Sequence, residues 1–129
     1  MAEGFARTYG ADALIPASAG LHPAGQVARD SIRAMEEKGI DIRQHFPKSI
    51  KHLSNATFDL VVNISGVLIP ESLTKPAKVQ VWEVDDPVSR SYQKHCDVRD
   101  EIEKLVMNLI LDLRRAQQLP KFRGQGSGN

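Results

Sequence analysis

The chain has 129 residues, of which 41% are hydrophobic and 26% are charged, a composition typical of one globular domain. Its 17 basic and 16 acidic side chains give a formal net charge of +1, which argues against a partner recognised by bulk charge, such as nucleic acid or a membrane surface. With one cysteine, Cys96, the chain forms no internal disulfide, and its N-terminal residues lack the apolar core of a secretory signal. We therefore expect a cytoplasmic protein.

The first third of the chain predicts two helices and a strand. Residues 2–9 are good helix formers and are followed by Gly10, which predicts a helix that ends there. Residues 13–21 predict a short strand, although the proline within it favours the edge of a sheet. From Pro23 onward, apolar residues recur at helical spacing as far as Gly39, which predicts a second helix.

Two β-rich segments and a long helix follow. Residues 58–64 form a nearly unbroken apolar, β-branched run, which is typical of a strand covered on both faces in a parallel sheet. Residues 78–84 predict a second strand, and residues 97–115 predict a long helix. The predicted apolar face of that helix consists of Val98, Ile102, Leu105, Val106, Leu109 and Leu113.

Strands that alternate with helices predict a layered α/β domain. We place its boundaries at residues 1–116. Residues 117–129 are rich in glycine and serine and have little to bury, so we expect a disordered tail.

Several short motifs occur together in a characteristic order and spacing. They are MAEGFAR at the start, SAG at residues 18–20, GIDI followed by KS within residues 39–49, WEVDDP at residues 82–87, and RDEI at residues 99–102. In these motifs the sequence resembles the low-molecular-weight protein tyrosine phosphatase and arsenate reductase family, and RDEI matches the arsenate reductase branch. The resemblance implies an α/β three-layer sandwich around a parallel sheet.

In that family a cysteine and an arginine, separated by five residues, lie in a phosphate-binding loop. Its backbone amides surround the phosphoryl oxygens, lower the pKa of the thiol and stabilise the charge of the transition state. Family members carry this loop immediately before the residues that match the start of this chain. The resemblance therefore implies an N-terminally truncated domain without the first strand or the loop. Cys96 does not substitute, because the residue six positions later is Ile102 and not arginine.

One catalytic residue is implied by the resemblance. Asp86, which precedes Pro87, matches the general acid that protonates the leaving oxygen and later activates water. Ser18 matches a residue that helps to hold the phosphate-binding loop. The residues themselves also have a plainer interpretation, since Asp85, Asp86 and Pro87 favour a turn at the end of a strand.

The sequence thus predicts a phosphatase-family domain that is inactive because its nucleophile is missing. Arsenate reduction is argued against, because the reductase branch needs two cysteines after its third strand and residues 63–73 contain none. The alternatives are a non-catalytic module that binds a partner or oligomerises, and an enzyme completed by another chain.

No cofactor and no metal site are predicted, because the four histidines show no spacing that places two on one helical face. The first strand of the family lies in the interior of its sheet. Its absence predicts two exposed strand edges, which either close directly on each other in a rearranged sheet or are covered by a second copy. We expect the homodimer, with a different protein partner as a further alternative.

Overall fold

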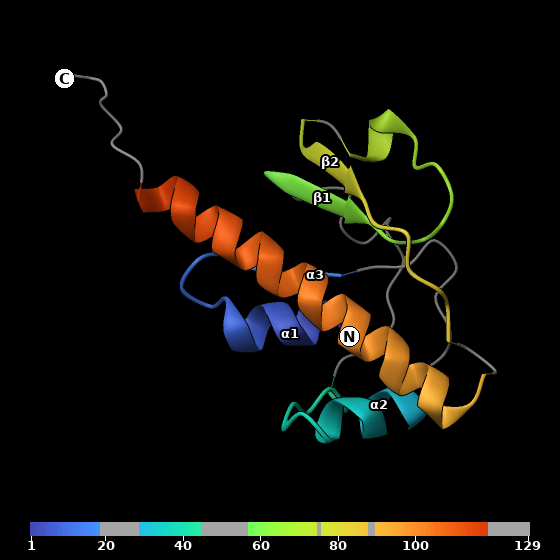
Figure 1. Cartoon of the computed structure of the whole chain (residues 1–129). Helices are drawn as coiled ribbons and strands as arrows, with labels where there is room; N and C mark the ends of the chain where they lie inside the picture. The colour runs from blue at the N-terminus through green and yellow to red at the C-terminus, as the bar shows by residue number, and fades with distance from the viewer. Residues whose placement is uncertain (19–28, 45–56, 75, 88–89, 119–129) are drawn as a thin grey trace, which may run out of the picture.

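The computed structural model describes residues 1–18, 29–44, 57–74, 76–87 and 90–118. These residues form an α/β fold with a parallel sheet, which confirms the predicted fold class. The elements in chain order are α1 (Ala2–Tyr9), α2 (Arg29–Glu36), β1 (Leu60–Asn63), the short 3-10 helix η2 (Glu71–Leu73), β2 (Lys78–Val81) and α3 (Tyr92–Gln118) (Figure 1).

The strands β1 and β2 pair in parallel, with Leu60 opposite Lys78 and Asn63 opposite Val81. Both lie inside the segments that the β-branched runs predict. Parallel neighbours cannot be joined by a tight turn, so the chain crosses over between them, and η2 lies in this connection.

The strand predicted for residues 13–21 is not formed. Residues 14–18 belong to no strand, and residues 19–21 lie outside the described residues. Pro16 has no N–H to donate to a ladder. Its carbonyl accepts a hydrogen bond from the guanidinium of Arg7 at 3.0 Å, so a side chain takes the place of a strand neighbour.

Glycines end the first two helices as the sequence predicts. The N–H of Gly10 donates to the carbonyl of Ala6 at 2.9 Å, which closes α1. Beyond α2, Gly39 has a φ of 74°, a left-handed conformation that costs glycine little. The N–H of Ile40 then reaches the carbonyl of Met35 at 3.1 Å. The predicted start of this helix at Pro23 lies outside the described residues.

The helix α3 is longer than predicted at both ends. It begins at Tyr92, and the hydroxyl of Ser91 accepts the N–H of Lys94 at 3.1 Å, a serine N-cap that the periodicity argument did not use. It continues through Gln118. Most of the predicted tail, residues 119–129, lies outside the described residues.

The hydrophobic core forms where α1 and α2 pack against α3 (Figure 1). Four residues of α3 spaced by four are buried, whereas Leu105, Leu109 and Leu113 of the predicted face are half-buried. Burying one large apolar side chain contributes about 1.5–3 kcal/mol, so this cluster supplies much of the stability. The buried cluster comprises Phe5, Met35, Ile40, Ile42, Val98, Ile102, Val106 and Ile110.

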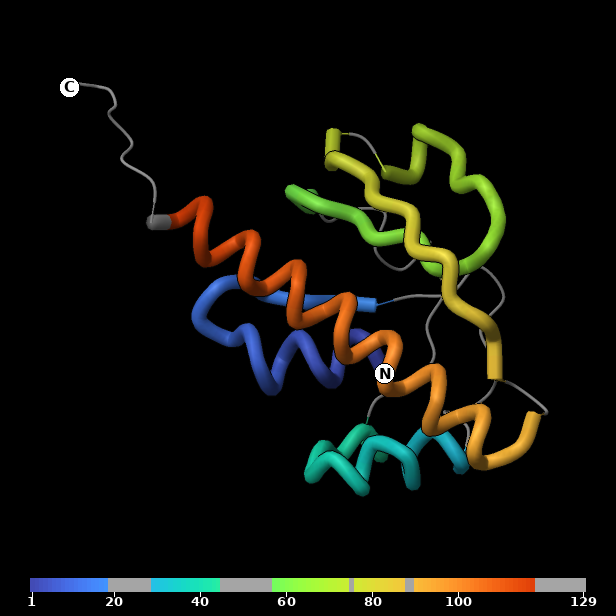
Figure 2. Tube along the Cα trace, viewed as in Figure 1, coloured from blue at the N-terminus to red at the C-terminus, as the bar shows by residue number. Residues whose placement is uncertain are grey.

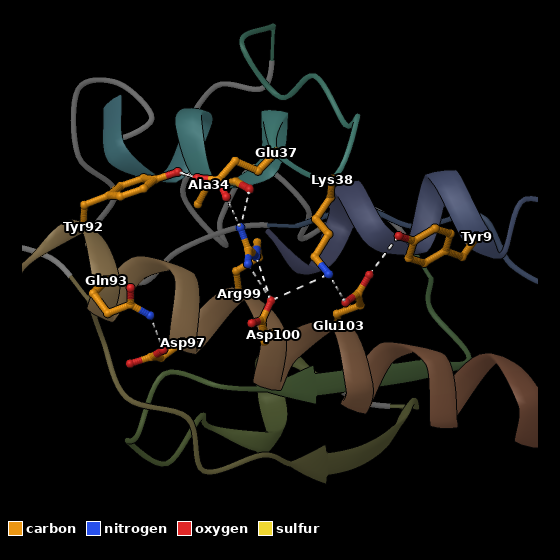
Figure 3. Close-up of polar contacts among 10 residues, drawn as sticks. All are labelled: Tyr9, Ala34, Glu37, Lys38, Tyr92, Gln93, Asp97, Arg99, Asp100 and Glu103. Atoms are coloured by element: carbon orange, nitrogen blue, oxygen red, sulfur yellow. Dashed lines mark hydrogen bonds and ion pairs between the residues drawn. The ribbon is translucent and has the colours of Figure 1, made fainter.

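Polar contacts add to the apolar contacts between the helices (Figure 3). The side chain of Arg99 is buried and donates to the carbonyl of Ala34 in α2 at 2.9 Å. Glu103 accepts the hydroxyl of Tyr9 in α1 at 2.8 Å and lies 3.1 Å from the ammonium of Lys38. Exposed ion pairs contribute little, so the buried Arg99 bond is the most important of these contacts.

The turn after α1 lies beside the last turns of α3 (Figure 2). Arg114 donates to the carbonyl of Tyr9 at 2.8 Å and forms an ion pair with Asp12 at 2.7 Å. Gln117 donates to the carbonyl of Ala13 at 3.3 Å. The last turns of α3 are therefore attached to the turn after α1. No helix within the described ranges has the length and apolar character needed to cross a membrane.

We predict that Gly10→Ala destabilises the fold by about 1–3 kcal/mol through overpacking. A Cβ at this position would lie 2.8 Å from Cδ1 and 2.9 Å from Cγ1 of Ile110. Urea unfolding of a double-mutant cycle tests this contact. In the Ile110→Ala background most of the cost of Gly10→Ala should disappear, because the clashing atoms are gone.

Gly39→Ala is the matched control for this cycle. Its cost is backbone strain at positive φ and nothing lies within 4 Å of its Cβ, so it should be additive with Ile110→Ala. Equal costs of Gly10→Ala in both backgrounds would contradict the proposed contact.

Candidate functional site

A cavity of about 300 Å³ opens at the carboxyl ends of the two parallel strands. The segments that follow parallel strands meet at the same edge of the sheet, which is where ligands bind in open α/β folds. Here these segments meet the start of α1, one side of α2 and one face of α3. The lining residues are Met1, Ala2, Ser31, Ile64, Ser65, Val84, Asp85, Asp86, Pro87, Val98 and Ile102.

Asp86, the residue predicted to act as general acid, is exposed and lines this cavity. It lies in the irregular segment that follows β2, and residues 82–87 show no turn, so the predicted turn at the end of the strand is not formed there. Its neighbour Asp85 accepts a hydrogen bond from the ammonium of Lys94 in α3 at 2.7 Å. This bond, with the charge of Lys94, lowers the pKa of Asp85 below its usual value of 3.8. Lys94 thereby links the acidic segment to the first turn of α3.

The side chain of Asn63 shapes the segment after β1. Asn63 is buried, donates to the carbonyl of Val67 at 2.7 Å and accepts the N–H of Ser65 at 3.0 Å. Gly66 adopts a φ of 81°, which allows the tight turn. As a result Ser65 lines the cavity. Sequence reasoning missed Ser65, although an asparagine two residues before a serine and three before a glycine is a turn signal.

The start of α1 and the side of α2 complete the cavity wall. The first amides of any α-helix have no acceptor within the helix and carry a partial positive charge. In α1 the capping position is Met1, and no side chain caps these amides. Ser31 contributes from α2 and was also missed by sequence reasoning, because nothing in its local pattern distinguishes it from a surface serine.

Two other residues from the sequence analysis lie apart from the cavity wall. The hydroxyl of Ser18 donates to the carboxylate of Glu3, in the first turn of α1. Cys96 is a free, buried cysteine in α3, 8% exposed. The wall of the cavity therefore offers carboxylates and hydroxyls but no thiol.

Within the described ranges, no group of three or more histidine, cysteine, aspartate and glutamate side chains is arranged to hold a metal ion. His95 is buried, and its Nδ1 lies 2.9 Å from the carbonyl oxygen of Ser91. The other three histidines, His22, His45 and His52, lie outside the described residues.

Comparison with known proteins gives consistent similarities over most of the chain. The family model described as low molecular weight phosphotyrosine protein phosphatase matches residues 1–119. The glutaredoxin arsenate reductase of Synechocystis sp. is 34% identical over 113 residues, which cover 85% of each chain. The arsenate reductase of Staphylococcus aureus strain Newman is 36% identical over 111 residues, 84% of this chain and 83% of the relative.

Solved structures agree with these relatives. An arsenate reductase in the phosphate binding state superposes with a TM-score of 0.77 at 31% identity, over 87% of this chain and 86% of the other. An arsenate reductase in the oxidized state gives the same TM-score at 32% identity and the same coverage.

These findings overturn the function predicted from the sequence. The prediction of an inactive phosphatase domain, with arsenate reduction argued against, is wrong, since the similar proteins and structures are arsenate reductases. The prediction had required two redox cysteines after the third strand, where residues 63–73 contain none. Electrons for a reduction can be delivered by thiols of a second molecule, so a cysteine count in one segment does not exclude the chemistry.

We predict that Lys94→Met raises the pKa of Asp85 toward 3.8, since the hydrogen bond and charge that lower it are removed. Because the pKa is lowered in the folded state, the stabilisation by this pair is present above pH 3.8 and is lost as the pH falls through the lowered pKa. A carboxyl-carbon NMR titration measures the shift. Lys104→Met, an exposed lysine on the same helix, is the control, and an equal shift in both variants would contradict the assignment.

Proposed function

Because the chain belongs to the low molecular weight phosphotyrosine protein phosphatase family, we propose that it acts in the reduction of arsenate. The observation that carries the proposal is a cavity lined by Asp86 in a chain 31–36% identical to arsenate reductases over more than four-fifths of its length. Arsenate is a tetrahedral oxyanion, and a site for it needs hydrogen-bond donors and a source of protons.

The cavity offers hydrogen-bond donors and a source of protons. The start of α1 brings helix amides whose partial positive charge favours an anion, and the hydroxyl of Ser31 is a further donor. Asp86 faces the same space and is suited to donate a proton to an oxygen that leaves arsenic. Asp85, held by Lys94, has the role of fixing the segment rather than of transferring protons.

The reduction of arsenic(V) to arsenic(III) takes two electrons, which two thiols supply. In the first step a thiolate attacks arsenic, an As–S bond forms, and an As–O bond breaks as the oxygen leaves as water with the proton of Asp86. In the second step another thiolate attacks the sulfur. The electron pair of the As–S bond then stays on arsenic, and arsenite and a disulfide are released.

The thiols for these steps come from outside these 129 residues. Cys96 is the only cysteine in the sequence, and it is buried away from the cavity wall. The proposed co-substrate is glutathione or a dithiol redox protein. Such thiols are kept reduced in the cytoplasm, where we expect the protein to act.

We predict arsenite formation when the purified chain is supplied with arsenate and a recycling thiol system. Glutathione with glutaredoxin and thioredoxin with its reductase are tested separately, and arsenite is measured directly together with NADPH consumption. Cys96→Ser should keep the rate, because its thiol takes no part in the steps above. Failure of both thiol systems to give arsenite above a protein-free blank would refute the proposed function.

Within that activity, Asp86→Asn should lower kcat by about 10²–10⁴-fold, the usual contribution of a positioned general acid. The matched control is Asp85→Asn at the adjacent carboxylate, which should keep most of the rate because the amide oxygen still accepts the hydrogen bond from Lys94 that fixes the segment. The loss in Asp86→Asn should shrink as the pH falls, because water and buffer then supply protons more readily. Equal rates for the two variants would remove Asp86 from the mechanism.

A further inference from the structure

The last turn of α2 leaves one backbone carbonyl without its helical donor. If the helix continued, the N–H of Lys38 would donate to the carbonyl of Ala34. Instead, α2 ends at Glu36, and the N–H of Lys38 donates to the carbonyl of Met35 at 2.9 Å. Carbonyls at the end of a helix carry partial negative charge. Because Ala34 is fully buried, its carbonyl needs a donor from within the protein.

Arg99 of α3 supplies that donor. Its Nη1 donates to the carbonyl of Ala34 at 2.9 Å and lies 3.6 Å from the carboxylate of Glu37 (Figure 3). A cation at the C-terminal end of a helix also interacts favourably with the helix dipole. Among the described residues, Arg99 is the only lysine or arginine that is buried, at 7% exposure. The guanidinium therefore caps α2 from a different helix.

Asp100 orients the guanidinium toward α2. Its Oδ1 accepts a hydrogen bond from Nε of Arg99 at 2.8 Å and also lies 2.8 Å from Nη2. Nε and Nη2 lie on the same side of the planar group, so Nη1 is directed elsewhere, toward Ala34. The same pair neutralises the charge of the arginine, which a buried cation requires.

The helix that Arg99 caps carries a residue of the cavity wall. Ser31 and Ala34 are three residues apart in α2, so they lie on the same side of the helix, one turn apart. Ser31 lines the cavity, and so does Val98, the neighbour of Arg99 in α3. Arg99 itself does not line the cavity. Its influence on the site therefore passes through α2.

We propose that Arg99 is a positioning residue for the candidate site. Its bond to Ala34 fixes the rotation and the axial position of α2, and thereby holds the hydroxyl of Ser31 at the cavity. The apolar contacts of Met35 hold α2 against the core, but apolar contact is non-directional, whereas a hydrogen bond depends on angle and distance. The inference rests on the proposed function, because it gives Ser31 the role of a donor to the oxyanion.

Equilibrium titration with arsenate, in the absence of any thiol, tests the coupling between Arg99 and Ser31. Ser31→Ala should weaken binding about 10-fold, because one hydrogen bond to a charged ligand is lost. Arg99→Met should weaken it about 3- to 10-fold, because the hydroxyl is no longer held in place. In the Ser31→Ala background, Arg99→Met should have no further effect. Equal losses in both backgrounds are the result of a merely structural role and would overturn the proposal.

Lys38→Met is the charge-matched control for Arg99→Met. The ammonium of Lys38, just after α2, lies 3.1 Å from the carboxylate of Glu103 in α3. This variant therefore also removes one positive charge and one polar contact with α3, but it leaves the bond to Ala34 in place. Its arsenate affinity should equal that of the wild type. A loss as large as in Arg99→Met would assign the effect to net charge and overturn the proposal.

Asp100→Ala takes the place of Arg99→Met in this cycle if the latter does not fold. The side chain of Asp100 is 55% exposed, so its removal leaves the core intact while it releases the guanidinium that it orients. Arsenate binding should weaken in the same direction, and again only while Ser31 is present. Losses that add to those of Ser31→Ala would contradict the positioning role.

Labelling of an introduced thiol separates this inference from the proposed function. In a Cys96→Ser background, Ser31→Cys places the only thiol of the chain in the cavity wall, where its alkylation rate reports how firmly α2 is held. Arg99→Met should raise this rate about 10-fold through local opening, and Lys38→Met should leave it unchanged. Faster labelling in a chain that binds no arsenate would support the hold of Arg99 on α2 and refute the proposed function alone. Equal labelling rates with and without Arg99 would overturn the positioning role.

Discussion

The packing of one face of α3 against the two shorter helices is the constraint on which the rest of the structure depends. Val98, Ile102, Val106 and Ile110 follow one another at four-residue spacing and are all buried. Rows spaced by four are the ridges that helices use to interdigitate, so this row determines how α1 and α2 lie on α3. The buried contact from Arg99 to Ala34 then fixes α2 against the same helix.

The candidate site is attached to this core and not merely adjacent to it. Val98 and Ile102 belong to the buried cluster and also line the cavity. Lys94, one turn before Val98, holds the segment that carries Asp86. The position of Asp86 is therefore set from α3, whereas the other polar groups of the cavity wall come from other elements. Rigid core packing on one side gives the cavity a fixed wall against which a small oxyanion can be held.

The proposed chemistry divides the work between this chain and a thiol donor. In this proposal the chain contributes the oxyanion environment and the proton, and the electrons come from thiols outside these residues. This division is consistent with a cavity wall that carries carboxylates and hydroxyls while Cys96 is enclosed in α3. A cysteine count in one chain is a poor guide to such a function, because the two thiols of a redox reaction can come from different molecules.

Local signals in the sequence were enough for the elements whose ends are set by backbone chemistry. Gly39 follows its helix because glycine adopts a positive φ at little conformational cost, and the N–H of Gly10 closes α1 on the carbonyl of Ala6. The β-branched runs indicated both parallel strands, and the motif around Asp86 predicted a residue that lines the cavity. In each case the determining interaction lies within a few residues along the chain.

The tertiary structure decided what depends on partners distant in sequence. Residues 14–18 form no strand, because Arg7 binds the carbonyl that a ladder would have used. Ile110 is buried where Leu109 was predicted, because α1 and α2 approach α3 from one side. Ser31 and Ser65 line the cavity only because the crossover and the helix packing bring them to the same end of the sheet. The sequence by itself indicated the helices and the two parallel strands and drew attention to Asp86. The tertiary structure decided which residues line the cavity with Asp86, because a cavity joins groups whose separation along the chain carries no local signal.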